Sequence, residues 1–219
     1  MTRMSGNGCS NNAGNPYPGD CEFTAFLRNK ARNRSVDVAR GDMWDACLGK
    51  AKDIKLLLLD VDGVLTDGSI IYTEKGEEIK SFNARDGFGI NILKKSGVEV
   101  GIITARVSNA LARRAKDLSV SRVYQGIRHK VQSFQKIIDD LGLQANEVAY
   151  MGDDWLDLPI LKRVGLSAAV ADATLEVRQI ADYVAQMPGG RGAVREICDL
   201  IIEARGKKDE LLNEYLNRT

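Results

Sequence analysis

The chain of 219 residues is long enough for one domain with a full hydrophobic core and too short for two. Its 31 basic and 30 acidic side chains leave a formal net charge of +1, and no basic run is interleaved with aromatic residues, so nothing predicts a nucleic-acid partner. A single histidine, His129, argues against a His-based triad, and no apolar run reaches the roughly 18 residues of a membrane span. Without a recognisable signal peptide, the chain is expected to be cytoplasmic, with no membrane partner.

The first 50 residues are predicted to form an N-terminal tail. The stretch SGNGCSNNAGNPYPGD is rich in Gly, Asn and Pro and buries too little apolar surface to offset the entropy cost of ordering. Scattered apolar residues over 23–48 predict weak helices at most. We therefore expect the organised domain over 51–204, followed by a charged C-terminal tail over 205–219.

From residue 54 onward, short apolar runs alternate with segments of helical period. The run IKLLLLDVDG is continuous and ends in acids and glycine, as a buried parallel strand that enters a loop does. Similar runs follow at 98–104, 122–125, 148–152 and 166–170. The apolar residues of VQSFQKIIDDL share one helical face, and Gly142 follows as a C-terminal cap. This alternation predicts a Rossmann-like, doubly wound parallel α/β sheet.

The stretch SIIYTEKGEEIKSF, residues 69–82, alternates between apolar and polar side chains. It has a turn signal at Lys75-Gly76. We predict a β-hairpin flap that projects from the loop after the first strand.

Polar residues stand at the ends of four predicted strands, where ligands bind in open parallel sheets. In chain order these residues are Asp60 and Asp62, Thr104, Lys130, and Asp153 with Asp154. Two carboxylates from one loop and a third from a neighbouring strand form an oxygen site suited to Mg²⁺. We expect Asp60 to be a covalent nucleophile toward phosphate and Asp62 to act as general acid and then base. Thr104 and Lys130 would stabilise charge on the phosphoryl oxygens.

Each signal has an ordinary structural explanation when taken alone. Acid pairs such as Asp60 and Asp62 are typical of turns and helix caps, and Thr104 has the character of an N-cap. Lys130 has the character of a solvated surface lysine. Their appearance at successive strand ends, in this order, favours catalysis.

The motifs DVDGVLTDG, IITAR, Lys130 and GDDWLDLP stand in the order and spacing of the haloacid dehalogenase superfamily of phosphotransferases. From residue 54 to about 206 the chain resembles, within that superfamily, the phosphatases of 3-deoxy-D-manno-octulosonate (KDO) 8-phosphate. The motifs that carry this resemblance are LTDG, SFNARDG, YQG, AVADA and GGRGAVREICDLI. The resemblance implies hydrolysis of KDO 8-phosphate to KDO and phosphate through an aspartyl phosphate, in lipopolysaccharide precursor synthesis.

The resemblance also implies the ligands of the site. Mg²⁺ is expected on Asp60, on the backbone carbonyl of Asp62 and on Asp153, with Asp154 and Asp157 as supporting acids. The implied contacts of the sugar-acid phosphate are Asp62, Asn83, Arg85, Asp86, Gly87, Arg106, Arg114 and Lys130. Arginines suit a substrate that carries both a phosphate and a carboxylate, because a guanidinium binds either group bidentately.

Many members of the superfamily cover their site with a cap domain, but here only about 40 residues separate Asp60 from Thr104, and fewer separate Lys130 from Asp153. No cap domain fits in either interval. In the resembled family the flap of one subunit covers its neighbour's site within a homotetramer, and the C-terminal tail closes the site. The long N-terminal tail and the final LLNEYLNRT depart from the family pattern.

Two other functions remain open at this stage. One is a sibling phosphatase that acts on a nine-carbon keto-sugar acid 9-phosphate of the sialic-acid type, with the same catalytic core. The other is a receiver-like or idle oligomerisation domain. Because the acid pair includes the nucleophile and a second acid cluster follows late, the pattern favours hydrolysis over a receiver.

Overall fold

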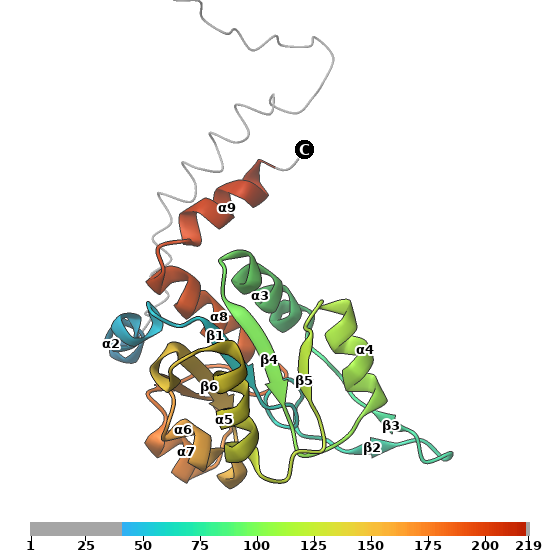
Figure 1. Cartoon of the computed structure of the whole chain (residues 1–219). Helices are drawn as coiled ribbons and strands as arrows, with labels where there is room; N and C mark the ends of the chain where they lie inside the picture. The colour runs from blue at the N-terminus through green and yellow to red at the C-terminus, as the bar shows by residue number, and fades with distance from the viewer. Residues whose placement is uncertain (1–40, 218–219) are drawn as a thin grey trace, which may run out of the picture.

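The structure, a computed structural model, describes residues 41–217 as one α/β unit (Figure 1). The strands are β1 (Leu56–Leu59), β2 (Ile71–Tyr72), β3 (Glu78–Ile79), β4 (Glu99–Ile103), β5 (Arg122–Tyr124), β6 (Val148–Gly152), β7 (Leu166–Ala169) and β8 (Tyr183–Val184). The α-helices are α2 (Asp42–Ala51), α3 (Ala84–Lys95), α4 (Asn109–Asp117), α5 (Lys130–Leu141), α6 (Leu158–Leu161), α7 (Leu175–Ile180), α8 (Ala193–Ala204) and α9 (Lys208–Leu216). Short 3-10 helices are η1 (Ala145–Glu147) and η2 (Trp155–Asp157). Most of the predicted N-terminal tail lies outside the described residues.

Six strands form a parallel sheet in the order β5-β4-β1-β6-β7-β8. The first strand is central: Leu56 is paired with Glu99 of β4 on one side and with Val148 of β6 on the other. All four leucines of β1 are fully buried. Burial of each leucine contributes about 1.5–3 kcal/mol, so β1 holds the centre of the core.

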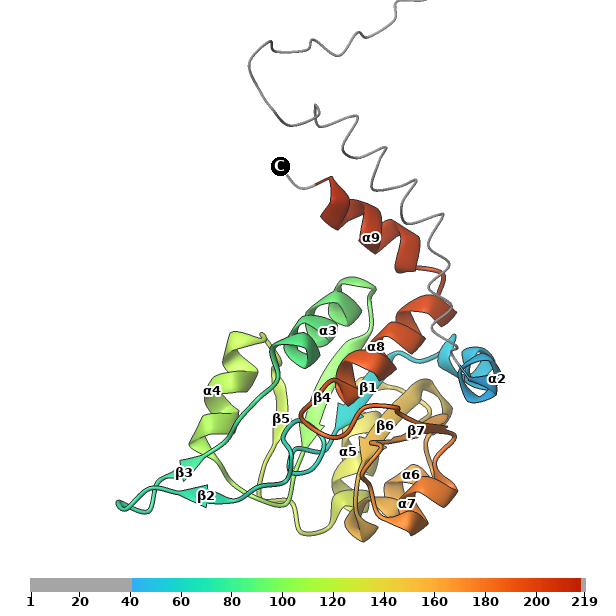
Figure 2. The ribbon, with the colours of Figure 1, turned by 180° about the vertical axis from the view of Figure 1, so that it is seen from behind.

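Helices cover both faces of the sheet, as Figures 1 and 2 show from opposite sides. From β1 the chain winds outward through α3 and α4 to β5, then crosses to β6 and winds the other way through α5, α6 and α7. Right-handed crossovers in opposite directions place these two sets of helices on opposite faces. Helix α8 packs against α3 and α2, and α2 buries Trp44, Cys47 and Ala51.

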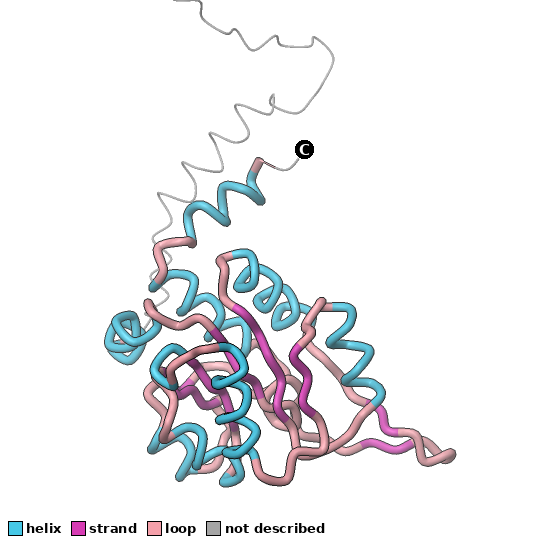
Figure 3. The backbone as a smooth tube through the Cα atoms, in the orientation of Figure 1, coloured by secondary structure: helices cyan, strands magenta, loops and turns pink. Residues whose placement is uncertain are grey.

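The structure confirms the doubly wound sheet predicted from the sequence. The five predicted strands are present, and β8 is an edge strand that the sequence did not reveal. Helix α5 ends at Gly142 in the left-handed conformation, with φ 63°. The predicted flap contains the antiparallel pair β2 and β3, drawn as short strands in Figure 3. Gly76 lies in the turn between them with φ 77°.

Helix α9 lies within the segment that we expected to be a charged tail. The ring of Tyr215 contacts the ring of Phe88 edge-on, with centroids 5.3 Å apart, and the Lys95 ammonium lies 5.0 Å from the Tyr215 centroid. These contacts hold α9 beside α3, at the opposite end of the molecule from the carboxyl ends of the strands (Figures 1 and 2). Across residues 41–217, no helix has the length and apolar character needed to cross a bilayer.

Candidate active site

Three carboxylates meet at the carboxyl edge of the central strands. Asp60 directly follows β1, and its backbone N–H donates to the Met151 carbonyl of β6 at 3.1 Å, so the residue is still anchored to the edge of the sheet. Asp153 follows β6, and Asp157 ends η2. One oxygen of each of Asp60, Asp153 and Asp157 lies within 4.8 Å of the others. The neighbouring positions of β1 and β6 in the sheet bring these acids together.

Lys130 provides the cation of this cluster. It is the first residue of α5, its side chain is buried, and its Nζ lies 3.0 Å from Asp60 Oδ2 and 2.7 Å from Asp157 Oδ1. Burial lowers the pKa of Lys130, but the charges of Asp60 and Asp157 outweigh burial and hold it above its ordinary value. Lys130 is therefore a buried ammonium aimed at the predicted nucleophile, and its surface-lysine explanation is wrong.

Asp157 orients this cluster through contacts to both of its oxygens. Its Oδ1 accepts hydrogen bonds from Lys130 and, at 2.6 Å, from the Tyr150 hydroxyl. Its Oδ2 accepts from the backbone N–H groups of Asp153 at 3.0 Å and Asp154 at 3.3 Å. Because these four donors occupy the carboxylate, Asp157 fixes the lysine and the loop after β6.

The acids disfavour one another's charge. Burial, followed by the charge of Asp157, raises the pKa of Asp60 from 3.8 to about 6. Burial and the charges of Asp157 and Asp60 raise the pKa of Asp153 from 3.8 to about 8. One lysine does not balance three carboxylates, so the cluster favours a further cation.

These residues fit Mg²⁺ by this charge imbalance and by their oxygen donors. Asp60 and Asp153 would hold the ion, since Asp157 is already saturated by hydrogen bonds. A backbone carbonyl from the nucleophile loop is the third ligand expected from the sequence. Asp154 is exposed and caps η2 by accepting from the Trp155 N–H at 2.7 Å, so its contribution is to the shape of the loop.

Glycines allow close packing around the nucleophile loop. Gly63 has φ 86°, and a Cβ there would overlap the carboxylate of Asp153. A Cβ on Gly189 would overlap the carbonyl oxygen of Gly63, and the Gly190 N–H donates to the Val64 carbonyl at 2.9 Å. The GGRG motif, residues 189–192, therefore packs directly against the backbone of the nucleophile loop.

Thr104 lies at the end of β4 and is buried. Its backbone N–H donates to Tyr124 at 2.9 Å, and its hydroxyl accepts from the Arg106 N–H at 3.3 Å. This is the turn-forming contact expected of an ordinary threonine cap. The hydroxyl keeps its own proton to donate, so the predicted contact to a phosphoryl oxygen remains available.

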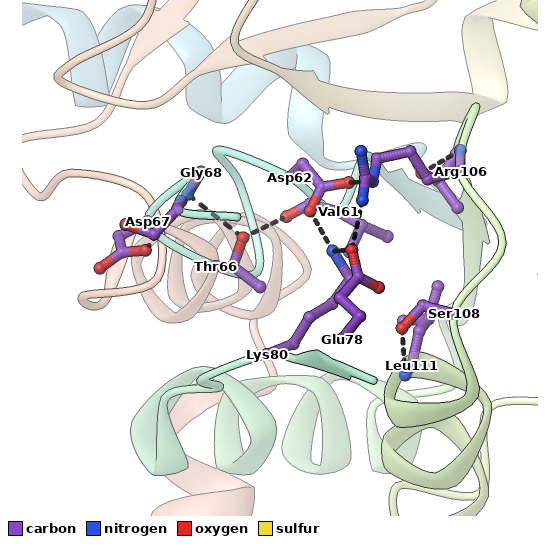
Figure 4. A network of polar contacts seen from close by, with 12 residues as sticks. Val61, Asp62, Thr66, Asp67, Gly68, Glu78, Lys80, Arg106, Ser108 and Leu111 are labelled. Atoms are coloured by element: carbon purple, nitrogen blue, oxygen red, sulfur yellow. Dashed lines mark hydrogen bonds and ion pairs between the residues drawn. The ribbon is translucent and has the colours of Figure 1, made fainter. Parts of the chain in front are cut away.

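Asp62 lies in a second polar network, which joins the site to the flap (Figure 4). Its Oδ1 forms an ion pair with Lys80, and its Oδ2 lies 3.6 Å from Arg106 Nε. Glu78 Oε1 accepts from Arg106 at 2.5 Å and lies 3.5 Å from Lys80 Nζ. Arg106 also donates to the Tyr72 hydroxyl at 3.4 Å. Two carboxylates and two cations thus balance one another beside the acid cluster.

The predicted substrate residues at the start of α3 have local roles in the structure. Asn83 caps α3 by accepting from the N–H groups of Arg85 at 2.8 Å and Asp86 at 3.4 Å. Arg85 is exposed. Asp86 is buried, and its carboxylate accepts from the backbone N–H groups of Gly192 and Arg195 at the start of α8, at 3.2 and 2.7 Å. Asp86 therefore ties α3 to α8.

Arg114 and Gly87 form a related contact. The guanidinium of Arg114 donates to the Asn83 carbonyl at 3.2 Å and lies 5.9 Å from the ring centroid of Phe82. A Cβ on Gly87 would overlap Arg114, so the glycine makes room for it. Among the described residues, no hydrogen bond or ion pair joins this group to the acid cluster. The structure thus brings Arg106 to Asp62 but leaves Arg114 with α3.

The sequence reasoning missed Lys80, Glu78 and Tyr150. Tyr150 is the one residue with a polar tip in the strand VAYMG, and a buried tyrosine needs a partner for its hydroxyl. Lys80 and Glu78 alternate with apolar Ile79 in the flap, which marks one face of the hairpin as polar. These sequence patterns do not indicate which charged or polar partner each of the three side chains contacts in the fold.

Comparisons with known proteins agree with this geometry. The family model for haloacid dehalogenase-like hydrolases matches residues 122–197. The KDO 8-phosphate phosphatase KdsC of Escherichia coli K12 is 48% identical over 176 residues, which cover 80% of this chain and 94% of that protein. The chain belongs to the KDO 8-phosphate phosphatase family. The resemblance drawn from the motifs is thereby confirmed.

Solved structures of the family have the same fold. The Yersinia pestis KDO 8-phosphate phosphatase aligns with a TM-score of 0.74 and 45% identity, over 75% of this chain and 89% of that one. The Moraxella catarrhalis enzyme, in complex with a magnesium ion, a phosphate ion and a KDO molecule, aligns with a TM-score of 0.76 and 39% identity, over 78% and 98% of the two chains. As predicted, no cap domain interrupts residues 41–217 of this family member.

Proposed function

We propose that this protein is a magnesium-dependent phosphatase that hydrolyses KDO 8-phosphate to KDO and phosphate, in lipopolysaccharide precursor synthesis. One observation carries the proposal: Asp60, Lys130 and Asp153 meet at the carboxyl edge of β1 and β6 in a chain that is 48% identical to a KDO 8-phosphate phosphatase. Carboxylates that raise each other's pKa values beside a buried lysine are typical of functional sites, and a domain without catalytic activity would not need this arrangement.

Asp60 is the proposed nucleophile. Its carboxylate oxygen attacks phosphorus, the bond between phosphorus and the sugar oxygen breaks, and an aspartyl phosphate forms. The Lys130 ammonium, 3.0 Å from Asp60, pairs with the incoming phosphoryl oxygens and reduces the repulsion between two anions. Bound Mg²⁺ supplies further positive charge at Asp60 and Asp153.

Asp62 is the proposed general acid and base. It donates a proton to the leaving sugar oxygen, and its carboxylate then takes a proton from the water that attacks the aspartyl phosphate. Asp62 is two residues from Asp60 on the same loop, which suits transfer at the far side of the phosphoryl group. The Thr104 hydroxyl, which keeps a proton to donate, would bind a phosphoryl oxygen.

A cavity beside Lys130 offers room for the rest of the substrate. It has a volume of about 450 Å³ and is lined in part by Arg128, His129, Trp155 and Leu156. These residues present cationic and apolar groups beside Lys130, which also lines the cavity. A keto-sugar acid, with a carboxylate and a ring, matches that lining better than a neutral sugar does.

A homotetramer in which the flap covers a neighbouring site is the proposed assembly. Two observations support it. The flap exposes a row of large apolar side chains, among them Ile70, Ile71, Tyr72 and Ile79. Among the described residues, the predicted substrate residues Asn83, Arg85 and Arg114 form no hydrogen bond or ion pair with the acid cluster of their own protomer, which leaves them available to a neighbouring copy.

Phosphate release by the purified protein with Mg²⁺ tests the function. KDO 8-phosphate, a nine-carbon keto-sugar acid 9-phosphate and a hexose phosphate are compared side by side, each with and without EDTA. We expect metal-dependent release with kcat/KM highest for KDO 8-phosphate. Preference for the nine-carbon substrate would replace the proposed substrate, and no release from any of them would contradict the phosphatase function.

A further inference from the structure

Lys80 lies inside the flap, unlike the apolar side chains of the hairpin. Ile71 and Ile79 are open to solvent, each 48% exposed. The side chain of Lys80, by contrast, is only 2% exposed. A buried ammonium costs free energy unless it is paired, so this lysine is held inward by its partners.

The partners of Lys80 are the carboxylates of Asp62 and Glu78. Lys80 forms an ion pair with Asp62 Oδ1, and Glu78 Oε1 lies 3.5 Å from the same ammonium (Figure 4). Burial raises the pKa of Glu78, but the hydrogen bond from Arg106 and other contacts outweigh burial and lower it overall. Glu78 is therefore a second anion for the buried ammonium, and the Lys80 side chain is held between Glu78 and Asp62.

The other oxygen of Asp62 is also restrained. Arg106 Nε lies 3.6 Å from Asp62 Oδ2, and Arg106 is itself held by Glu78. Cations from two separate elements, the flap and the loop after β4, thus contact the two oxygens of one carboxylate. Such a pair of contacts fixes the orientation of the carboxylate about its side-chain bonds.

We propose that Lys80 is a positioning residue that holds the Asp62 carboxylate of its own subunit in the orientation required for proton transfer. The proposal rests on the acid and base role proposed above for Asp62. Lys80 acts through Asp62 and does not touch the reacting phosphoryl group. The flap would thus have a role within its own protomer, in addition to any covering of a neighbouring site.

The test uses kcat and KM for KDO 8-phosphate in the full-length protein with saturating Mg²⁺. Lys80→Met keeps an apolar stem of similar length and removes the charge, and Lys80→Arg keeps the charge. We expect Lys80→Met to lower kcat by about 10- to 100-fold, part of the usual contribution of general acid–base catalysis, with KM changed less than about threefold. Lys80→Arg should recover most of kcat. Lys75→Met, at the exposed tip of the same hairpin, is the matched control and should match wild type.

A double-mutant cycle separates positioning from other roles. If Lys80 acts through Asp62, adding Lys80→Met to Asp62→Asn should change kcat by less than about twofold. An equal loss in both backgrounds, a raised KM with unchanged kcat, or wild-type kcat in Lys80→Met would each overturn the proposal. Wild-type kcat in Asp62→Asn itself would instead refute the role of Asp62, so the two failures are distinguishable.

Discussion

The two charged networks beside the nucleophile are built in opposite ways. The acid cluster of Asp60, Asp153, Asp157 and Lys130 lies just after two strands, at the end of η2 and at the start of α5, at the edge of a buried sheet. The network of Asp62, Glu78, Lys80 and Arg106 joins three segments, which are the nucleophile loop, the loop after β4 and the exposed flap. The first network carries excess negative charge, whereas the second is balanced.

Because of this difference in charge, the acid cluster is suited to binding a metal ion and the Asp62 network to holding a group that transfers a proton. Excess negative charge in a buried cluster raises carboxylate pKa values and attracts a cation, which is what a metal site requires. A balanced network holds a carboxylate in place without a metal. The rigid sheet would therefore hold the nucleophile and Mg²⁺, and the flap would hold the acid and base.

The largest effect is expected from the nucleophile itself. Asp60→Asn should lower phosphate release by a factor on the order of 10⁴ or more, because the amide cannot attack phosphorus. Circular dichroism and thermal melting should show an intact fold, since the change removes one of three mutually repelling carboxylates. Turnover close to wild type in this variant would rule out the aspartyl phosphate.

A comparison of Asp157 with Asp154 tests whether the cluster depends on its orienting acid. Asp157→Asn should lower the free energy of unfolding by about 2–3 kcal/mol, because one partner of the buried Lys130 is lost and a donor replaces an acceptor. This loss of stability is partly offset, because the variant no longer has the Asp157 charge that repels Asp60. Asp154→Asn is the control, and as an equivalent cap it should stay within about 0.5 kcal/mol of wild type in denaturant unfolding. Equal stability of the two variants would contradict the orienting role.

The charge imbalance of the acid cluster predicts a pH effect in metal-free protein. The folded-state pKa values of Asp60 and Asp153 are raised from 3.8 to about 6 and about 8, so the stability they contribute is present below pH 4 and lost as pH rises through these values. In EDTA, the melting temperature should fall by a few degrees or more between pH 5 and pH 8, at about 2–4 °C per kcal/mol.

Added Mg²⁺ should oppose this fall, because it binds the charged form, and its stabilisation should grow with pH. Asp153→Asn should flatten the metal-free profile. A melting temperature that rises from pH 5 to pH 8 in EDTA would contradict the cluster's electrostatics.

The smallest effect on protomer stability is expected at the outer face of the flap. Ile71→Ser/Ile79→Ser removes a cross-strand pair of exposed side chains and should change the stability of the separated protomer by less than about 0.5 kcal/mol, as surface changes do. If the flap covers a neighbouring subunit, light scattering should show a smaller mass, and activity should fall. Leu175→Ser, at an exposed leucine of α7 away from the flap, is the control. An unchanged mass in the flap variant would contradict the proposed assembly.

Much of the acid cluster could be predicted from the sequence because its parts have local signatures. Asp60 and Asp153 follow continuous apolar runs, and parallel strands end at one edge of a sheet. Lys130 begins a segment of clear helical period that ends at Gly142. The sheet, the flap and the family followed from the same signals. The polar tip of Tyr150, within an apolar run, had no comparable signature.

The sequence by itself determined the doubly wound fold, the order of the strand-end acids and membership of the phosphatase family, because periodicity and motif spacing are properties of the chain. The tertiary structure alone decided which charges meet. Lys80 pairs with Asp62 across 18 residues, and Asp86 accepts from α8 across more than 100. Such pairings depend on how the hairpin and helices pack in space, and burial then determines which charges need a partner.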